Sequence, residues 1–127
     1  NVICATAISQ YAALGALQAG PAYCEPFVAE MASVRQQGLD AFDTINNRVR
    51  PLLSTGAFYF FVEVPDYSGD DLTLARQLIE KFGVAVIPSS AFGAVEHCGF
   101  RASYGALKTD SAIEGLERLI SGLSHLT

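Results

Sequence analysis

The spacing of the apolar residues changes once along this chain, at Pro51, and the change limits the folds that the chain can adopt. Before Pro51, apolar residues recur at helical intervals, which predicts helices. Beyond it, residues 57–64 (AFYFFVEV) form a short run of aromatic and β-branched side chains, which is typical of a buried strand. The chain must therefore join a helical first part to a sheet that begins after residue 51.

Two helices are expected before Pro51. The first covers residues 6–19, with Thr6 as its N-cap, and Gly20-Pro21 ends it. Pro21 can open the second helix, whose apolar period continues to about residue 49. At ~1.5 Å per residue this long helix would span roughly 40 Å, enough to bridge two bodies or to flank a sheet. Gly38 weakens it by about 1 kcal/mol relative to alanine.

The polar segment after the first strand leads into a further helix. Residues 65–71 (PDYSGDD) read as a turn, and residues 70–82 as a helix. Asp70 and Asp71 stand at its positive N-terminal end, and Gly83 is suited to its C′ position.

The remaining third of the chain predicts two more strands and a terminal helix. The strands are residues 84–87 and 100–104, with a loop over 89–99 between them. The last helix opens with Ser111 and Glu114, spaced as a capping box. About three strands with helices on one face predict a two-layer α+β sandwich, entered through the long N-terminal bridging helix. The helix at 6–19 has no evident place in these layers, and the abrupt opening at Asn1 suggests a domain cut from a longer protein.

Charge and length exclude several classes of protein. The net charge is −5, and the eight Lys+Arg residues form no basic run, so nucleic acid is not an expected partner. No stretch approaches the ~20 apolar residues of a membrane span. The apolar first twenty residues lack a basic start, which argues against a signal peptide.

The cysteines point to a compartment rather than to a site. Cys4, Cys24 and Cys98 are odd in number and widely spaced, which suits neither a disulfide framework nor a zinc site. We therefore expect a reducing cytoplasm. Cys98 and His97 are adjacent and would point to opposite sides of an extended chain, so a Cys–His nucleophile is disfavoured. His97 and His125 are too few and too far apart for a metal site.

Four segments, in order, carry a resemblance to a known family. They are TAISQYAALGAL at 6–17, GAFY at 56–59, GVAVIPSSAFG at 83–93 and FRASY at 100–104. Together they resemble the C-terminal region of fold-type I pyridoxal-phosphate enzymes, the aspartate aminotransferase superfamily (class I/II aminotransferases). The chain departs from the family at Arg35-Gln36-Gln37, where two arginines and an aspartate are frequent, and at Ser89, where glycine is usual. Serine adopts positive φ less readily than glycine, so a left-handed backbone at Ser89 would be strained.

The resemblance implies an enzyme and this chain's place in it. The enzyme would transfer an amino group between an amino acid and a 2-oxo acid with pyridoxal 5'-phosphate, as a homodimer; related lyases and synthases remain open. Residues 1–20 would be the end of the large cofactor domain and residues 21–127 the C-terminal small domain. The lysine that carries the cofactor belongs upstream, and neither Lys81 nor Lys108 matches its motif. The isolated chain would therefore bind no cofactor, hold no catalytic residue and be inactive alone.

Arg101 is the main candidate for substrate binding. An arginine within an apolar strand needs a partner, because burying an unpaired guanidinium is costly. Its planar fork suits a carboxylate. From the residues alone, an edge-strand arginine facing water or a structural ion pair is the more frequent reading. The resemblance implies instead that Arg101 binds the substrate's α-carboxylate.

Phe92 is the second candidate, in the loop SSAFG at 89–93. The resemblance implies that this loop lines and closes over the substrate pocket; the alternative is a surface loop whose Phe92 joins the core. Two sets of residues read more simply as structural. Thr6, Ser9 and Gln10 are expected to cap the first helix rather than reach a neighbouring active site. Tyr59 and Phe60 are expected in the core rather than on a cofactor.

A different class of function stays open. The chain could be a free-standing α+β binding or regulatory module that has the fold but no catalysis. The two readings differ in what the reading frame encodes upstream of Asn1, either a lysine-bearing cofactor domain or a start codon.

Overall fold

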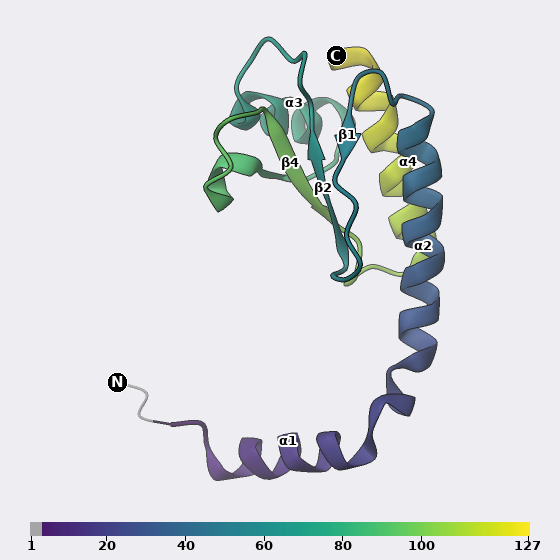
Figure 1. The fold of residues 1–127 in the computed structure, drawn as a ribbon, viewed down its shortest axis with the longest axis vertical. Coiled ribbons are helices and arrows are strands. Elements are labelled where there is room, and N and C mark those ends of the chain that lie inside the picture. The colour runs from purple at the N-terminus through teal and green to yellow at the C-terminus, as the bar shows by residue number, and fades with distance from the viewer. Residues whose placement is uncertain (1–3) are drawn as a thin grey trace. The chain divides into compact units, whose positions relative to one another are not determined.

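The computed structural model describes residues 4–127, so the opening at Asn1 lies outside the described residues (Figure 1). The chain divides into two compact units, of which the first ends at Glu30 and the second is Met31–Thr127. Among the helices of residues 4–127, none has the combination of length and apolar character that crossing a bilayer requires.

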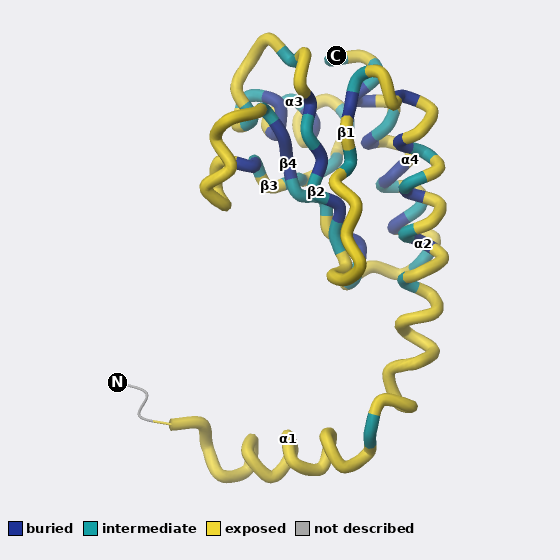
Figure 2. Tube along the Cα trace, in the orientation of Figure 1, coloured by how far each residue is buried: buried dark blue, intermediate teal, exposed yellow. Residues whose placement is uncertain are grey.

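The secondary structure described in the first unit is helical. The helix α1 covers Ala7–Ala19, and the Thr6 hydroxyl caps it by accepting from the Ser9 N–H at 3.4 Å. Gly20 ends it with a φ of 75°, a conformation that glycine adopts without strain. This confirms the predicted first helix. No residue of α1 is buried, although its apolar side chains are spaced as a helical seam (Figure 2).

The long second helix is shorter than its apolar period suggests. Pro21 opens only a 3-10 turn, η1 (Pro21–Tyr23), and α2 covers Glu25–Asp43 rather than continuing to about residue 49. After Asp43 the backbone tightens into i→i+3 bonds, and the Thr44 hydroxyl donates to the Ala41 carbonyl at 2.6 Å. Such local side-chain bonds compete with helix continuation. At ~1.5 Å per residue α2 spans roughly 28 Å.

Gly38 has a packing role that its helix propensity hides. It is buried in α2, and a Cβ added there would overlap the Phe60 ring. The missing side chain therefore lets α2 approach the sheet, at the cost in helix propensity of about 1 kcal/mol.

The sheet of the described residues has four strands in the order β1-β2-β4-β3, each pair antiparallel. The strands are β1 Arg50–Pro51, β2 Tyr59–Glu63, β3 Ile87–Pro88 and β4 Gly99–Ser103. The sequence reading missed β1, which is too short to show a pattern. It also began the third strand too early, since only Ile87 and Pro88 pair with β4.

Two further helices complete the second unit. The helix α3 covers Asp71–Phe82, with Asp70 as its N-cap and Gly83 in the left-handed region at its end, as predicted. The helix α4 covers Thr109–Leu126 and begins before the predicted capping box. The prediction that the helix opens at Ser111 was wrong. The Lys108 carbonyl accepts the first helical hydrogen bond, from the Ala112 N–H, so Lys108 is the N-cap residue and Ser111 lies inside the first turn.

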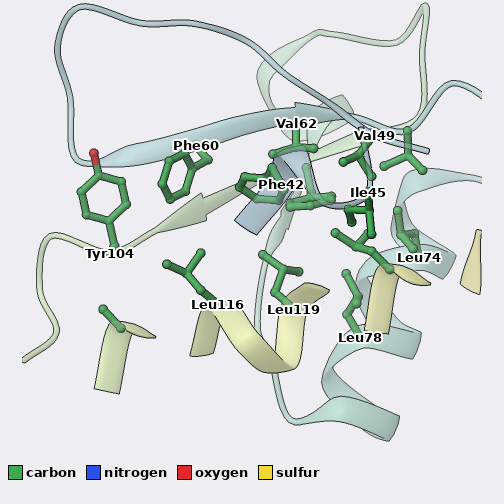
Figure 3. Close-up of a cluster of buried hydrophobic side chains, with 14 of the residues drawn as sticks. Phe42, Ile45, Val49, Phe60, Val62, Leu74, Leu78, Tyr104, Leu116 and Leu119 are labelled. Atoms are coloured by element: carbon green, nitrogen blue, oxygen red, sulfur yellow. The ribbon is translucent and has the colours of Figure 1, made fainter. Parts of the chain in front are cut away.

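The core lies between the helices and one face of the sheet (Figure 3). Phe60 and Val62 of β2 and Phe100 of β4 point into it. The helices contribute Phe42 of α2, Leu74 and Leu78 of α3, and Leu116, Leu119 and Leu123 of α4. The predicted two-layer α+β architecture is confirmed.

Candidate functional site at Arg101

Arg101 lies at the middle of the sheet, on the face away from the core. It pairs with Phe61 on one side and Ile87 on the other, so β4 is a central strand and not an edge. Its neighbour Phe100 is fully buried, and alternate residues of a strand point to opposite faces. We call the face that carries Tyr59, Phe61 and Arg101 the outer face.

Two aromatic rings flank the half-buried guanidinium. The Arg101 Cζ lies 4.6 Å from the centroid of the Phe92 ring and 5.2 Å from that of Tyr59. Phe92 also packs edge to face on Phe61, with ring centroids 6.1 Å apart. Cation–π contacts of this kind contribute about 0.5–2 kcal/mol each. The rings are close to the guanidinium but offer no hydrogen-bond acceptor to its N–H groups in these contacts.

The in-plane donors of Arg101 lack a partner within the described residues. Its Nε is buried and makes no hydrogen bond. The ion pairs of residues 4–127 join Arg50 to Glu63 and Arg118 to Glu114, and neither involves Arg101. An unsatisfied buried donor costs about 1–3 kcal/mol, and more when charged. The buried Nε is out of reach of a ligand, but the two terminal nitrogens form a pair of donors that suits a planar anion such as a carboxylate.

Phe92 belongs to a short 3-10 turn, η2 (Ser89–Phe92), which the structure fastens at its start. Gly93 closes it with a φ of 80°, so the positive φ falls on glycine. Ser89 has no positive φ, which answers the concern raised by a serine at that position. Its side chain is buried, and its hydroxyl donates to an oxygen of Asp71 at 3.0 Å.

The Asp71 carboxylate holds the first two residues of this turn. It accepts from the Ser90 N–H at 2.6 Å and from the Ser90 hydroxyl at 3.1 Å, as well as from Ser89. Desolvation alone would raise the pKa of Asp71, but these hydrogen bonds outweigh it and hold the pKa below its usual value. The carboxyl is therefore ionised near neutral pH.

Tyr59 and Asp71 are residues of this site that sequence reasoning missed. Tyr59 was expected in the core, but only Phe60 lies there, while Tyr59 lies beside Arg101. The period-2 alternation of β2 could have separated the two. Asp71 was expected only to favour the helix terminus, and nothing in the local sequence indicates its contact with the turn.

The remaining candidates have structural contacts. Thr6 and Ser9 cap α1, and the Gln10 amide donates to the Ala5 carbonyl at 2.8 Å. Burial, then the charges of Asp71 and Asp70, raise the pKa of Cys98 to about 11, which keeps the thiol protonated. The described residues hold no cluster of three metal-ligating side chains, and their cysteines are free.

The residues on this face do not by themselves form a pyridoxal-phosphate site. The amine of Lys81 donates to Gln77 on α3, and Lys108 is the N-cap residue of α4. Both belong to the helical layer, whereas Arg101 points from the outer face. The donor set at Arg101 comprises a guanidinium and aromatic rings, without an amine to bond a cofactor aldehyde.

Comparison with known proteins decides the family. The family model described as "Aminotransferase class I and II" matches residues 1–119. The chain belongs to the class I and II aminotransferases. An aspartate/prephenate aminotransferase named in Aquifex aeolicus is 36% identical over 95% of this chain. An N-acetyl-LL-diaminopimelate aminotransferase named in Bacillus subtilis is 32% identical over 94% of it.

Solved aminotransferase structures share the fold. A Silicibacter pomeroyi protein assigned to the aminotransferases superposes with a TM-score of 0.82 and 31% identity, over 96% of this chain and 32% of that one. A Mycobacterium tuberculosis aminotransferase gives 0.71 and 28%, over 82% of this chain and 27% of that one. The chain spans 31% of the Aquifex relative and 30% of the Bacillus relative, so it matches one part of each aminotransferase.

Proposed function

We propose that this chain is the C-terminal part of a pyridoxal-phosphate-dependent aminotransferase, in which Arg101 binds the α-carboxylate of the amino acid or 2-oxo acid. The observation that carries the proposal is the Arg101 guanidinium, whose Cζ lies 4.6 Å from the Phe92 ring centroid and 5.2 Å from that of Tyr59, without a hydrogen-bonding acceptor among the described residues. Membership of the aminotransferases supplies the reaction class. The outer face then forms one wall of the substrate pocket, and Phe92 is its second contact.

In this proposal the residues of the chain bind and orient. The Arg101 Nε is buried, so a carboxylate would be met through the two terminal nitrogens of the guanidinium. Two parallel N–H···O bonds fix both the position and the plane of the carboxylate. Holding a reactant in one orientation contributes to rate by removing the entropy cost of alignment. Phe92 and Tyr59, both within cation–π distance of the guanidinium, would help to hold it in place.

The rest of the machinery is proposed to lie in the part of the enzyme that precedes this chain. Residues 1–20 would end the large cofactor domain, and residues 21–127 would form the small domain. The exposed apolar side chains of α1, among them Ile8 and Leu17, are consistent with burial against that missing domain. We propose a cytoplasmic homodimer, in agreement with the free cysteines of the described residues.

The proposal predicts that cofactor attachment requires the longer protein. We would express residues 1–127 and the full product of their reading frame, incubate each with pyridoxal phosphate, reduce with borohydride and map adducts by mass spectrometry. The longer product should carry one adduct, at a lysine upstream of Asn1, because Lys81 and Lys108 lie in the helical layer. The short chain should carry none and should not transaminate.

A stoichiometric adduct at Lys81 or Lys108 in the short chain would contradict the proposal. So would a start codon at or near Asn1, which would favour a free-standing α+β binding or regulatory module instead. The chain spans 31% and 30% of the Aquifex and Bacillus relatives, and we propose that the remaining part of the enzyme lies upstream of it.

A further inference from the structure

We propose that Asp71 is a positioning residue of the Arg101 site, which fixes the η2 turn so that the Phe92 ring covers the guanidinium. The inference rests on the proposed function, because it takes Arg101 as the group that meets the substrate. It assigns to the first residue of α3 a role in substrate affinity, although Asp71 itself contacts neither Arg101 nor Phe92 among the contacts described above.

One carboxylate receives three hydrogen bonds from two consecutive serines. Its Oδ2 accepts from the Ser90 N–H at 2.6 Å and the Ser89 hydroxyl at 3.0 Å, and its Oδ1 accepts from the Ser90 hydroxyl at 3.1 Å. Hydrogen bonds to an ionised acceptor are about twice as strong as neutral ones. Ser89 is 1% exposed and its bond to Oδ2 is partly buried, whereas the two bonds from Ser90 lie at the surface.

The helix does not need Asp71 for its own capping. Asp70 is the N-cap of α3 and accepts from the Thr73 N–H at 2.6 Å. The neighbouring Asp71 carboxylate turns instead to a segment 19 residues further along the chain. The two adjacent aspartates thus have different roles: Asp70 caps the helix, and Asp71 joins the helix to η2.

The hydrogen bonds of the turn connect Ser89 and Ser90 to the backbone that follows Phe92. The Gly93 N–H donates to the Ser90 carbonyl at 3.0 Å and the Ala94 N–H to the Ser89 carbonyl at 3.3 Å. Fixing Ser89 and Ser90 therefore fixes the backbone on both sides of Phe92. Phe92 is 46% exposed, and its ring meets Phe61 and Arg101 on the outer face.

The other end of the attachment is rigid. The helix α3 is rooted in the core by Leu74 and Leu78, both fully buried. Asp71 thereby connects the packed helical layer to the outer face around the end of β3. Without this connection η2 would still be held by the Ser89 hydroxyl on the His97 carbonyl at 3.3 Å and by the pairing of Pro88 with Phe100. Ser90 would lose both of its attachments to the Asp71 side chain, and Phe92 would leave the guanidinium for part of the time.

The test uses the intact enzyme and three variants, Asp71→Ala, Asp71→Asn and Asp70→Ala. Asp71→Ala should raise KM for the amino acid by about tenfold, with a smaller change in kcat, because the guanidinium loses its fixed plane. Asp71→Asn keeps one acceptor oxygen and should restore part of the affinity. Asp70→Ala removes a carboxylate from the same helix terminus and should destabilise the helix without changing KM.

A second readout does not depend on activity. Chymotrypsin cleavage after Phe92, followed by mass spectrometry under native conditions, reports how often the turn opens. Cleavage should be several-fold faster in Asp71→Ala than in Asp70→Ala or the parent enzyme. Should Asp71→Ala fail to fold, Asp71→Asn gives the same comparison with a smaller expected change.

The outcomes separate this inference from the proposed function. If Arg101→Ala raises KM while Asp71→Ala and Asp71→Asn match Asp70→Ala in KM and cleavage, Asp71 positions nothing and the inference is overturned. If Arg101→Ala leaves KM unchanged, the proposed function fails and the inference fails with it. A raised KM and faster cleavage in the Asp71 variants alone would support the inference.

Discussion

Replacing Arg101 by alanine in the intact enzyme should lower kcat/KM for amino acids and 2-oxo acids by about 10²- to 10³-fold. Removing one partner of a desolvated, hydrogen-bonded charge pair costs about 2–5 kcal/mol, and each 1.4 kcal/mol is a factor of ten. The substrate carboxylate would lose both donors and would face a surface whose remaining groups at this point are the Phe92 and Tyr59 rings. Steady-state kinetics measures the loss, and the cofactor absorbance should stay nearly unchanged.

Two further variants show whether the loss belongs to the guanidinium. Arg101→Lys should recover only part of the activity, because an ammonium group cannot give two parallel bonds in one plane. Arg50→Ala removes an arginine from β1, which β2 separates from the strand of Arg101. Arg50 pairs with Glu63 at 3.5 Å, and its loss should leave kcat/KM within a factor of about two to three. Normal turnover in Arg101→Ala would show that another group binds the carboxylate.

Replacing Leu78 by alanine should lower the free energy of unfolding by about 3–5 kcal/mol. Leu78 is fully buried in α3 and lies against α4 at Gly122, where an added Cβ would come 2.8 Å from the Leu78 Cδ2. The substitution therefore removes contacts on both helices and leaves a cavity between them. Urea unfolding followed by circular dichroism measures the change.

The same helix offers a matched control. Leu72 is 66% exposed on α3, so Leu72→Ala should change the free energy of unfolding by less than about 1 kcal/mol. Equal losses in the two variants would mean that the packing of α3 on α4 does not stabilise the second unit as described.

The sequence predicts well those features that depend on neighbouring residues. Thr6 was expected as an N-cap and Asp70 at the positive end of its helix, and both accept from a backbone N–H three residues on. Gly20 and Gly83 were expected to end their helices, and each has positive φ. Residues 100–104 were expected as a strand, and β4 carries Arg101 at its middle. Capping and hydrophobic periodicity depend on residues close together in the sequence, so they can be predicted from the sequence directly.

Features set by tertiary contacts were less accessible. The end of α2 at Asp43 could not be read from an apolar period that continues to Val49, because Ile45 and Val49 join the core from turns rather than from a helix. The strand β1 exists through its pairing with β2 alone. The start of α4 at Thr109 lacks a capping side chain, so the nearest capping pattern, at Ser111, misplaced it.

The residues of the site also differ in whether the nearby sequence or a tertiary contact determines their place. The apolar strand around Arg101 marked it as unusual, and the resemblance supplied a role. That Phe92 covers the guanidinium follows from the path of η2, and that Asp71 fastens η2 follows from a contact across 19 residues. The burial of Ser89, whose hydroxyl requires an acceptor, is visible only once the chain is folded.

The central claim is that Arg101 binds the substrate's α-carboxylate, and the most direct measurement is a crystal structure of the intact enzyme with a bound amino acid or an unreactive analogue. We predict two hydrogen bonds from the terminal nitrogens of Arg101 to the two carboxylate oxygens, each about 2.7–2.9 Å, with Phe92 and Tyr59 on the faces of the guanidinium. A carboxylate bound by a different cation, with Arg101 beyond hydrogen-bonding distance, would contradict the claim.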